Sequence, residues 1–259
     1  MTLLDPRLFR HPNFTTGVLG QMLQQITLGG AMIALPLFLQ MSLEYNAMEA
    51  GLSLAPLSLT MFAAAMVAGR RAGKRRPAAI IRAGFVLASL GTASIIPLIV
   101  TGAGLGLLVS QLNNYTLAPV EEERISEAAG VNSAAGSFGL SFGLAMAGGI
   151  LLASLSFSFT RMTADSDVIP AAQQQQIAAA LETDAEVMSD TELDKRITGQ
   201  PPEIEEEILA INHDARNRSL QVALLVPLLA GLGGLVNSFR MVRLPDIKPA
   251  APLEGLDLG

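Results

Sequence analysis

Five long stretches of this 259-residue chain carry no charged side chain. They are residues 12–43, 50–69, 83–120, 131–160 and 219–239. A helix needs about 20 mostly apolar residues to cross the hydrocarbon core of a bilayer. Four of the stretches fit one crossing each, and 83–120 is long enough for two crossings joined by a tight turn. The sequence therefore predicts an all-α membrane protein with six transmembrane helices, at about 14–40, 50–69, 79–97, 101–119, 132–158 and 218–238.

Composition excludes most other classes of protein. Hydrophobic residues make up 50% of the chain and charged residues 15%, against about 25% charged in a typical soluble domain. The absence of cysteine excludes disulfides, Cys-ligated zinc, iron–sulfur clusters and cysteine nucleophiles. The two histidines, His11 and His213, lie near opposite ends of the chain. We therefore expect no enzyme activity, no cofactor and no metal site. The net charge of -6 argues against nucleic acid as a partner.

The distribution of lysine and arginine predicts the orientation in the membrane. These residues favour cytoplasmic loops, and the segment 70–76 contains five of them in seven positions, RRAGKRR. Placing it inside also places inside the N-terminal arm, the loop 121–124 and the C-terminal tail 239–259. The chain is then expected to lie in the bacterial cytoplasmic membrane, with both its N-terminus and its C-terminus in the cytoplasm.

The long segment 159–217 is then outside, and it is acidic. It contains Asp165, Asp167 and Glu182 and ends in the run Glu205-Glu206-Glu207. The glutamines at 173–176 predict a surface helix, and isoleucines at 204, 208 and 211 predict an apolar stripe on a second helix. Two interpretations stay open, a solvated extracytoplasmic loop and an acidic cap that captures substrate.

Two clusters of polar residues interrupt the predicted spans. Gln21, Gln24 and Gln25 share one face of the first span, and Gln111, Asn114 and Tyr115 have the same spacing in the fourth. Asn113 lies about 200° from Gln111 and is expected to face elsewhere. Both clusters lie roughly 10–15 Å from the cytoplasmic surface if the helices rise 1.5 Å per residue. They predict either the lining of a common aqueous cavity or hydrogen bonds between helices.

Small residues recur in the fourth and fifth predicted spans. The fourth opens with glycines at 102, 104 and 106, and the fifth has the four-residue spacings Gly139/Gly143 and Ala145/Gly149. Such spacings allow close helix packing, with a conformational role in a moving transporter as the alternative. No acidic or basic side chain lies deep in a predicted span, so the sequence has no visible proton-coupling residue.

Several short motifs, taken in order, resemble one branch of a known family. They are LFRHPNF at 8–14, LPLFLQ at 35–40, AGLSLAP at 50–56, GRRAGKRRP at 69–77, GAGLG at 102–106 and AAGVNS at 128–133. Together they resemble the C-terminal half of the fourteen-span drug:proton antiporters of the major facilitator superfamily. The resemblance implies a fold like one half of a major facilitator, and efflux of drug-like, amphipathic molecules coupled to protons.

The resemblance also identifies a cytoplasmic signature loop and two departures from the family. The loop comprises Gly69, Arg70, Gly73, Lys74, Arg75 and Arg76. In the family an acidic residue stands at the position of Gly73. Its absence leaves two interpretations of the loop, the family's charge-relay gating role or a topology signal alone. The family also has an N-terminal six-span half and two extra central spans before this region, and nothing in this sequence corresponds to them. The expected partners are thus the bilayer, a small-molecule substrate, and a missing N-terminal half or a second copy; a truncated half that does not transport, or a membrane assembly partner, is the alternative.

Overall fold

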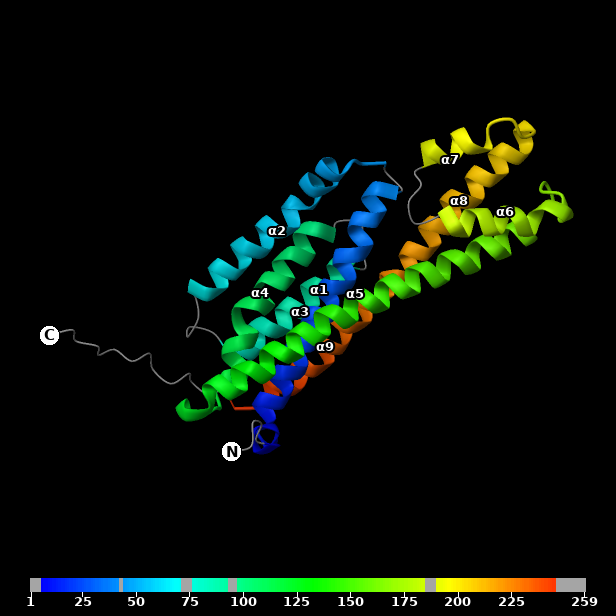
Figure 1. Ribbon diagram of the computed structural model, residues 1–259. Coiled ribbons are helices and arrows are strands. Elements are labelled where there is room, and N and C mark those ends of the chain that lie inside the picture. Colours follow the sequence, from blue (N-terminus) through cyan, green and yellow to red (C-terminus); the bar gives the residue numbers. More distant parts are fainter. Residues whose placement is uncertain (1–5, 42–43, 71–75, 93–96, 185–189, 246–259) are drawn as a thin grey trace. The chain divides into compact units, whose positions relative to one another are not determined.

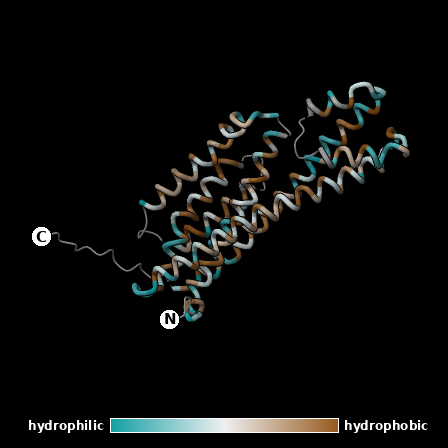
Figure 2. Tube along the Cα trace, in the orientation of Figure 1, coloured by the Kyte–Doolittle hydropathy of each residue, from teal (hydrophilic) through white to brown (hydrophobic). Residues whose placement is uncertain are grey.

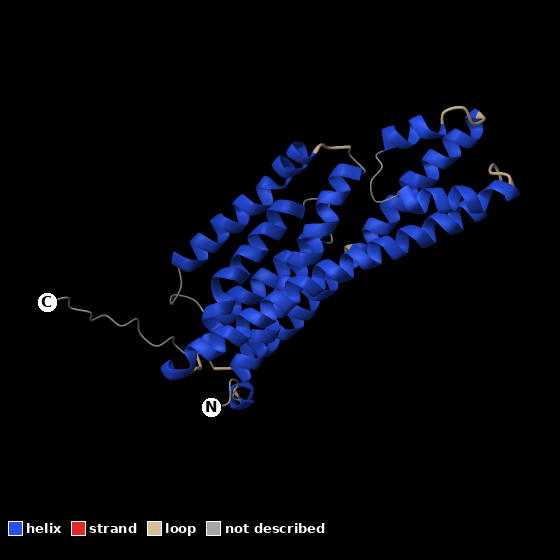
Figure 3. Ribbon diagram, in the orientation of Figure 1, coloured by secondary structure: helices blue, strands red, loops and turns tan. Residues whose placement is uncertain are grey.

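The computed structural model describes residues 6–41, 44–70, 76–92, 97–184 and 190–245. These residues are helical almost throughout and form no strand (Figures 1 and 3). The α-helices are α1 (Pro12–Met41), α2 (Ala47–Arg70), α3 (Pro77–Thr92), α4 (Pro97–Leu117), α5 (Ile125–Ala164), α6 (Ala171–Asp184), α7 (Asp190–Ile197), α8 (Pro202–Ala223) and α9 (Leu225–Arg243). The predicted all-α fold is confirmed.

The first, second and fifth predicted spans lie within α1, α2 and α5, and the sixth lies within the α8–α9 segment. The third overlaps α3 but includes 93–96, which lie outside the described residues, and the fourth extends two residues beyond the end of α4. Four helical stretches are long and apolar enough to cross a membrane: Pro12–Leu37, Ala47–Arg70, Glu122–Ala164 and Pro202–Arg243. Pro77–Gly91 in α3 is a shorter apolar helix. The chain is a multi-pass membrane protein, and the exact limits of its crossings remain a prediction. With 40 residues, α5 is about 60 Å long, twice the thickness of the hydrocarbon core.

The chain divides into two compact units. The first comprises the described parts of Met1–Leu28, Pro56–Ser141 and Leu228–Gly259, and the second those of Gly29–Ala55 and Phe142–Pro227. Each unit has its own buried apolar cluster, and each is described by itself.

In the first unit, glycines of α4 allow close contact with α2 and α3. A Cβ atom added at Gly104 would lie 2.7 Å from the carbonyl oxygen of Gly84 in α3, and one at Gly106 would lie 2.9 Å from Cβ of Ala64 in α2. Two helices can approach this closely only where a glycine presents backbone alone. The packing interpretation of the glycine run therefore holds for α4.

The small residues of α5 do not all serve in packing. A Cβ atom at Gly139 would meet the backbone of Met22 in α1, whereas one at Gly149 would meet nothing within 4 Å. The same four-residue spacing in the sequence therefore includes a close helix contact at Gly139 and an open position at Gly149.

The two ends of the described chain meet in the first unit. Leu8 and Phe14 are buried with Ala128 of α5, and the ring of Phe9 packs edge-on against Phe14. Nδ2 of Asn13 donates to the carbonyl oxygen of Pro245, 3.1 Å away. Nδ2 of Asn237 in α9 donates to the carbonyl oxygen of Thr16, 2.8 Å away. These contacts hold the start of α1 against the end of α9.

In the second unit, the acidic segment 159–217 folds into helices with a core of its own. Hydrophilic residues gather on α6, α7 and the first part of α8 (Figure 2). As the sequence predicted, α6 contains the glutamine run, and the isoleucine stripe of α8 is buried. The shared core is formed by Leu155, Phe159, Ile169, Leu181, Leu193, Ile204, Ile208, Ile211 and Ala215. We call α6, α7, the first part of α8 and the end of α5 the helical cap; it is a packed structure and not an open loop.

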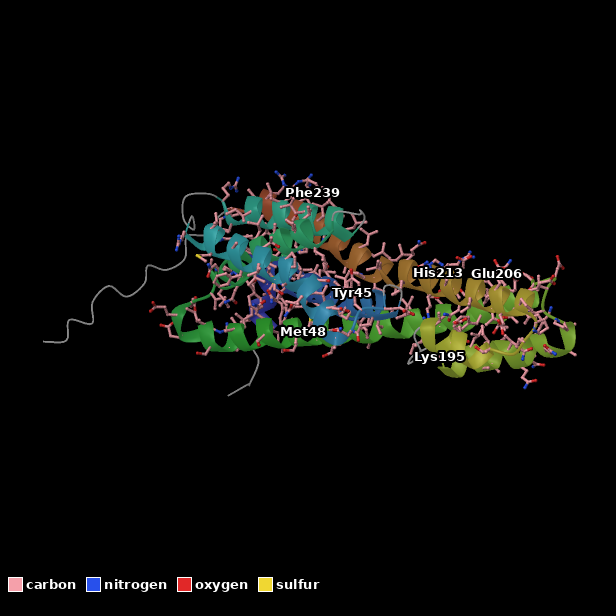
Figure 4. All side chains as sticks on the ribbon, turned by 90° about the horizontal axis from the view of Figure 1, so that it is seen from above. Tyr45, Met48, Lys195, Glu206, His213 and Phe239 are labelled. Carbon is pink, nitrogen blue, oxygen red and sulfur yellow. The ribbon has the colours of Figure 1, made fainter. Side chains whose placement is uncertain are left out.

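Carboxylates on the cap accept hydrogen bonds within it. Oγ of Ser166 donates to Glu207, 2.6 Å away, and Oγ of Ser156 donates to Glu182, 2.7 Å away. The backbone N–H of Gly199 donates to Glu205, 2.8 Å away. Other polar side chains of the unit, among them Lys195, Glu206 and His213, are seen in Figure 4.

Replacing the buried Phe159 by alanine is expected to loosen the cap. The Phe159 side chain is completely buried, so Phe159→Ala leaves a cavity whose cost is about 3–5 kcal/mol. Hydrogen exchange of this variant should be faster than that of the wild type in α6 and α8, and the increase there should exceed any increase in α3. The matched control is Phe157→Ala, because Phe157 in the same helix is 64% exposed. Equal protection of the cap in both variants would contradict the role of this core.

Candidate functional site

The three glutamines of α1 differ in their contacts. Gln24 is 2% exposed, and its Oε1 has no hydrogen-bond partner among the described residues. Gln21 and Gln25 are half-buried and lie toward α5: a Cβ atom at Gly136 would be 3.3 Å from Nε2 of Gln21 and 3.6 Å from Cγ of Gln25. Gln21 and Gln25 are therefore the two glutamines that reach the surface of this unit beside α5.

On α4, burial separates the polar residues. Gln111 is 2% exposed, and its Nε2 donates to the carbonyl oxygen of Ala68 in α2, 3.4 Å away. Tyr115 is buried as well. Asn113 and Asn114 are exposed, and Asn114 makes a long hydrogen bond of 3.5 Å to the carbonyl oxygen of Ser110 in its own helix. As the helical spacing predicted, Gln111 and Asn113 face different sides; the accessible one of the two is Asn113.

Helix α5 lies beside the accessible polar residues of both α1 and α4. Nδ2 of Asn132 donates to Oδ1 of Asn113, 3.1 Å away, and Asn132 itself is 4% exposed. Asn132 and Gly136 are four residues apart, so they lie one turn apart on the same side of α5. That side therefore contacts Asn113 at Asn132 and both glutamines at Gly136. We call Gln21, Gln25, Asn113 and Asn132 the polar face.

Asn132 was not predicted as a site residue. Its sequence signal is weak, because it is one amide at the start of the apolar run 131–160, inside a motif that suggested only the family. The spacing of Asn132 and Gly136 indicates a polar site only once it is known that α1 and α4 lie against that side of α5.

The polar face consists of carboxamides alone. Each amide offers two N–H donors and an oxygen acceptor and keeps no charge at any ordinary pH. An amide facing hydrocarbon without hydrogen bonds costs several kcal/mol. Its exposed members are therefore suited to contact water, a ligand or another protein surface, and the chemistry available to them is neutral hydrogen bonding.

The cytoplasmic signature loop lies partly in the described chain. Gly69 and Arg70, at the end of α2, are exposed, while Gly73, Lys74 and Arg75 lie outside the described residues. Nη2 of Arg76 donates to the carbonyl oxygen of Leu244, 3.4 Å away, just beyond the end of α9. A cation there stabilises the negative end of the helix dipole. Nearby, the guanidinium of Arg82 lies 5.8 Å from the ring centre of Phe239, which Figure 4 labels.

Comparison with protein families identifies the class of the chain. The sequence profile of the Major Facilitator Superfamily matches residues 3–144, more than half of the chain. The chain belongs to the Major Facilitator Superfamily. The matched region contains the whole polar face, and members of this superfamily are membrane transporters.

Two curated relatives of this superfamily member are named as transport or resistance proteins. A probable actinorhodin transporter from Streptomyces coelicolor is 24% identical over 196 residues, which is 69% of this chain and 33% of the relative. A multidrug resistance protein B homolog from Mycobacterium tuberculosis is 30% identical over 152 residues, 52% of this chain and 28% of the relative. The matches thus span about a third of each relative's length.

Proposed function

We propose that this chain is one half of an efflux transporter for small amphipathic molecules, acting within a proton-coupled antiporter. The observation that carries the proposal is the polar face, where amides of α1 and α4 lie beside neighbouring turns of α5 within otherwise apolar segments. The names of both relatives, a probable actinorhodin transporter and a multidrug resistance protein B homolog, support efflux as the direction of transport.

The proposed substrate cavity is lined by the same six residues that the sequence predicted, and these residues differ in how accessible they are. Gln21 and Gln25 are half-buried and Asn114 is exposed, so in this proposal they make the first contacts with substrate. Gln24, Gln111 and Tyr115 are buried, so substrate reaches them only if helices separate. In this proposal the buried amides act after a conformational change, and the accessible ones determine binding.

Proton coupling is assigned to another part of the assembly. An intramembrane coupling site needs a group that gains and loses a proton, and the polar face holds amides alone. We therefore propose that the other half of the transporter supplies the titrating group. The alternative function is a half that does not transport, or an assembly partner in the membrane, which agrees with a polar face that holds amides alone.

A binding measurement separates the two functions. Purified chain in lipid nanodiscs is expected to bind the amphipathic dye rhodamine 6G saturably above the level of empty discs. Gln25→Leu should weaken this binding about tenfold, since loss of hydrogen bonds worth about 1.4 kcal/mol changes affinity by that factor. Gln40→Leu is the control, because Gln40 lies in the same helix, is exposed and is not a member of the polar face. Dye binding no greater than that of empty discs would favour the alternative function.

The proposed orientation has both ends in the cytoplasm of a bacterial cell and the helical cap outside. Single cysteines can test this, because the chain has no cysteine of its own. We expect a membrane-impermeant maleimide added to intact cells to label Asp167→Cys in the cap and to leave Glu121→Cys unlabelled until the cells are opened. Both positions are exposed. The reverse labelling pattern would show that the chain has the opposite orientation in the membrane.

A further inference from the structure

We propose that Asn113 recognises an uncharged carbonyl oxygen of the transported molecule and that Asn132 is its positioning residue. The inference rests on the proposed function and names the chemical group that the polar face selects. It also assigns a role to a residue pair outside the predicted cavity.

The hydrogen bond between the two asparagines determines what Asn113 presents. Oδ1 of Asn113 accepts from Nδ2 of Asn132 at 3.1 Å. With its oxygen engaged by α5, the exposed Asn113 keeps both N–H groups of its amide for an outside partner. A ligand that meets Asn113 therefore needs an acceptor, and the carbonyl oxygen of a ketone, ester or amide supplies one.

Burial explains why Asn132 positions the contact and does not make it. Asn132 is 4% exposed, and its Oδ1 is buried without a partner among the described residues. Exchanging N and O in both amides would orphan an N–H in place of an oxygen, and unpaired buried N–H groups are the rarer of the two. This preference supports an outward donor on Asn113.

The surroundings favour an uncharged hydrogen-bonding group. The members of the polar face are neutral amides, and the helices that carry them are apolar over most of their length. A group with a localised charge would lose its hydration here without gaining an opposite charge from this face, whereas a cation with a delocalised charge, such as rhodamine 6G, is less strongly hydrated. A neutral carbonyl loses far less and gains a hydrogen bond in a medium of low dielectric constant.

The test compares two uncharged probes that differ in one group. The first is Prodan, a naphthalene dye whose ketone shifts its emission to the red when it accepts a hydrogen bond; the second is its analogue with a methylene in place of the carbonyl. In nanodiscs, with empty discs subtracted, the chain should bind Prodan about tenfold more tightly than the analogue. Asn113→Leu should abolish this preference and the red shift, and Asn113→Gln, which keeps the donor, should retain most of both.

Asn132→Leu tests the positioning role, and Asn217→Leu in α8 is the matched control for replacing an amide by leucine. Asn132→Leu should reduce the preference for Prodan and its red shift while leaving binding of the analogue unchanged. Circular dichroism melting checks that each variant is folded, and Asn113→Gln keeps the test informative if a leucine variant is not.

The outcomes separate this inference from the proposed function. If rhodamine 6G binds saturably but Asn113→Leu weakens both probes equally or neither, the function stands and the inference is wrong. The same holds if wild-type chain binds rhodamine 6G and neither probe. If no dye binds above empty discs, the proposed function fails and the inference with it.

Discussion

Purified chain in liposomes is expected not to move a cationic dye in response to a pH gradient. Alternating access in this superfamily rocks two six-helix halves against each other around a site near the midplane. The chain matches about a third of each relative's length and is proposed to be one half, so a single copy has no opposing half. Dye movement should equal that of empty vesicles.

A second reason for this result is chemical. Coupling requires a group that changes protonation during the cycle, and the polar face consists of amides. A parallel dimer of two copies would imitate the two halves, since these are related by an axis along the membrane normal. It would enclose the polar face but would still lack the titrating group.

The measurement compares the chain with empty vesicles and with vesicles in which an uncoupler dissipates the gradient. Dye movement that appears only with the chain, and disappears with the uncoupler, would overturn the prediction. Facilitated movement that ignores the gradient would agree with an uncoupled dimer and would leave the coupling argument intact.

Replacing Gly104 by leucine is expected to disrupt the first unit. A Cβ atom at this position would lie 2.7 Å from the carbonyl oxygen of Gly84 and would also crowd the backbone nitrogen of Ala88. Backbone atoms cannot yield as a flexible side chain can, so α3 and α4 must separate. The cost is about 3 kcal/mol, which lowers Tm by about 10 °C for a chain of this size.

Gly149→Leu is the matched control, because Gly149 is also a helical glycine but has nothing within 4 Å of an added Cβ atom. Leucine there gains about 1 kcal/mol in helix propensity, so its Tm should equal or exceed that of the wild type. Thermal unfolding followed by circular dichroism in detergent measures both. A similar loss of Tm in the two variants would show that close α3–α4 contact does not limit stability.

The sequence determined the class of the fold. Charge-free stretches long enough to cross a bilayer permit few structures other than membrane helices. Inside the bilayer, every backbone polar group must find its hydrogen-bond partner within the protein itself. The described chain is accordingly helical, and the ordered motifs led to the correct superfamily. The buried isoleucine stripe of α8 was also predictable, because helical periodicity places residues 204, 208 and 211 on one side.

The tertiary structure decided which polar residues are accessible. Helical spacing fixes the angle between Gln111 and Asn113, but only the position of α2 determines that Gln111 is the buried one. Likewise, Asn132 joins the polar face because α5 lies beside both α1 and α4. The cap acquires a core for the same reason, since Phe159 and Ile208 are 49 positions apart and yet pack together. Local sequence encodes the faces of each helix, whereas contacts between distant segments determine what covers them.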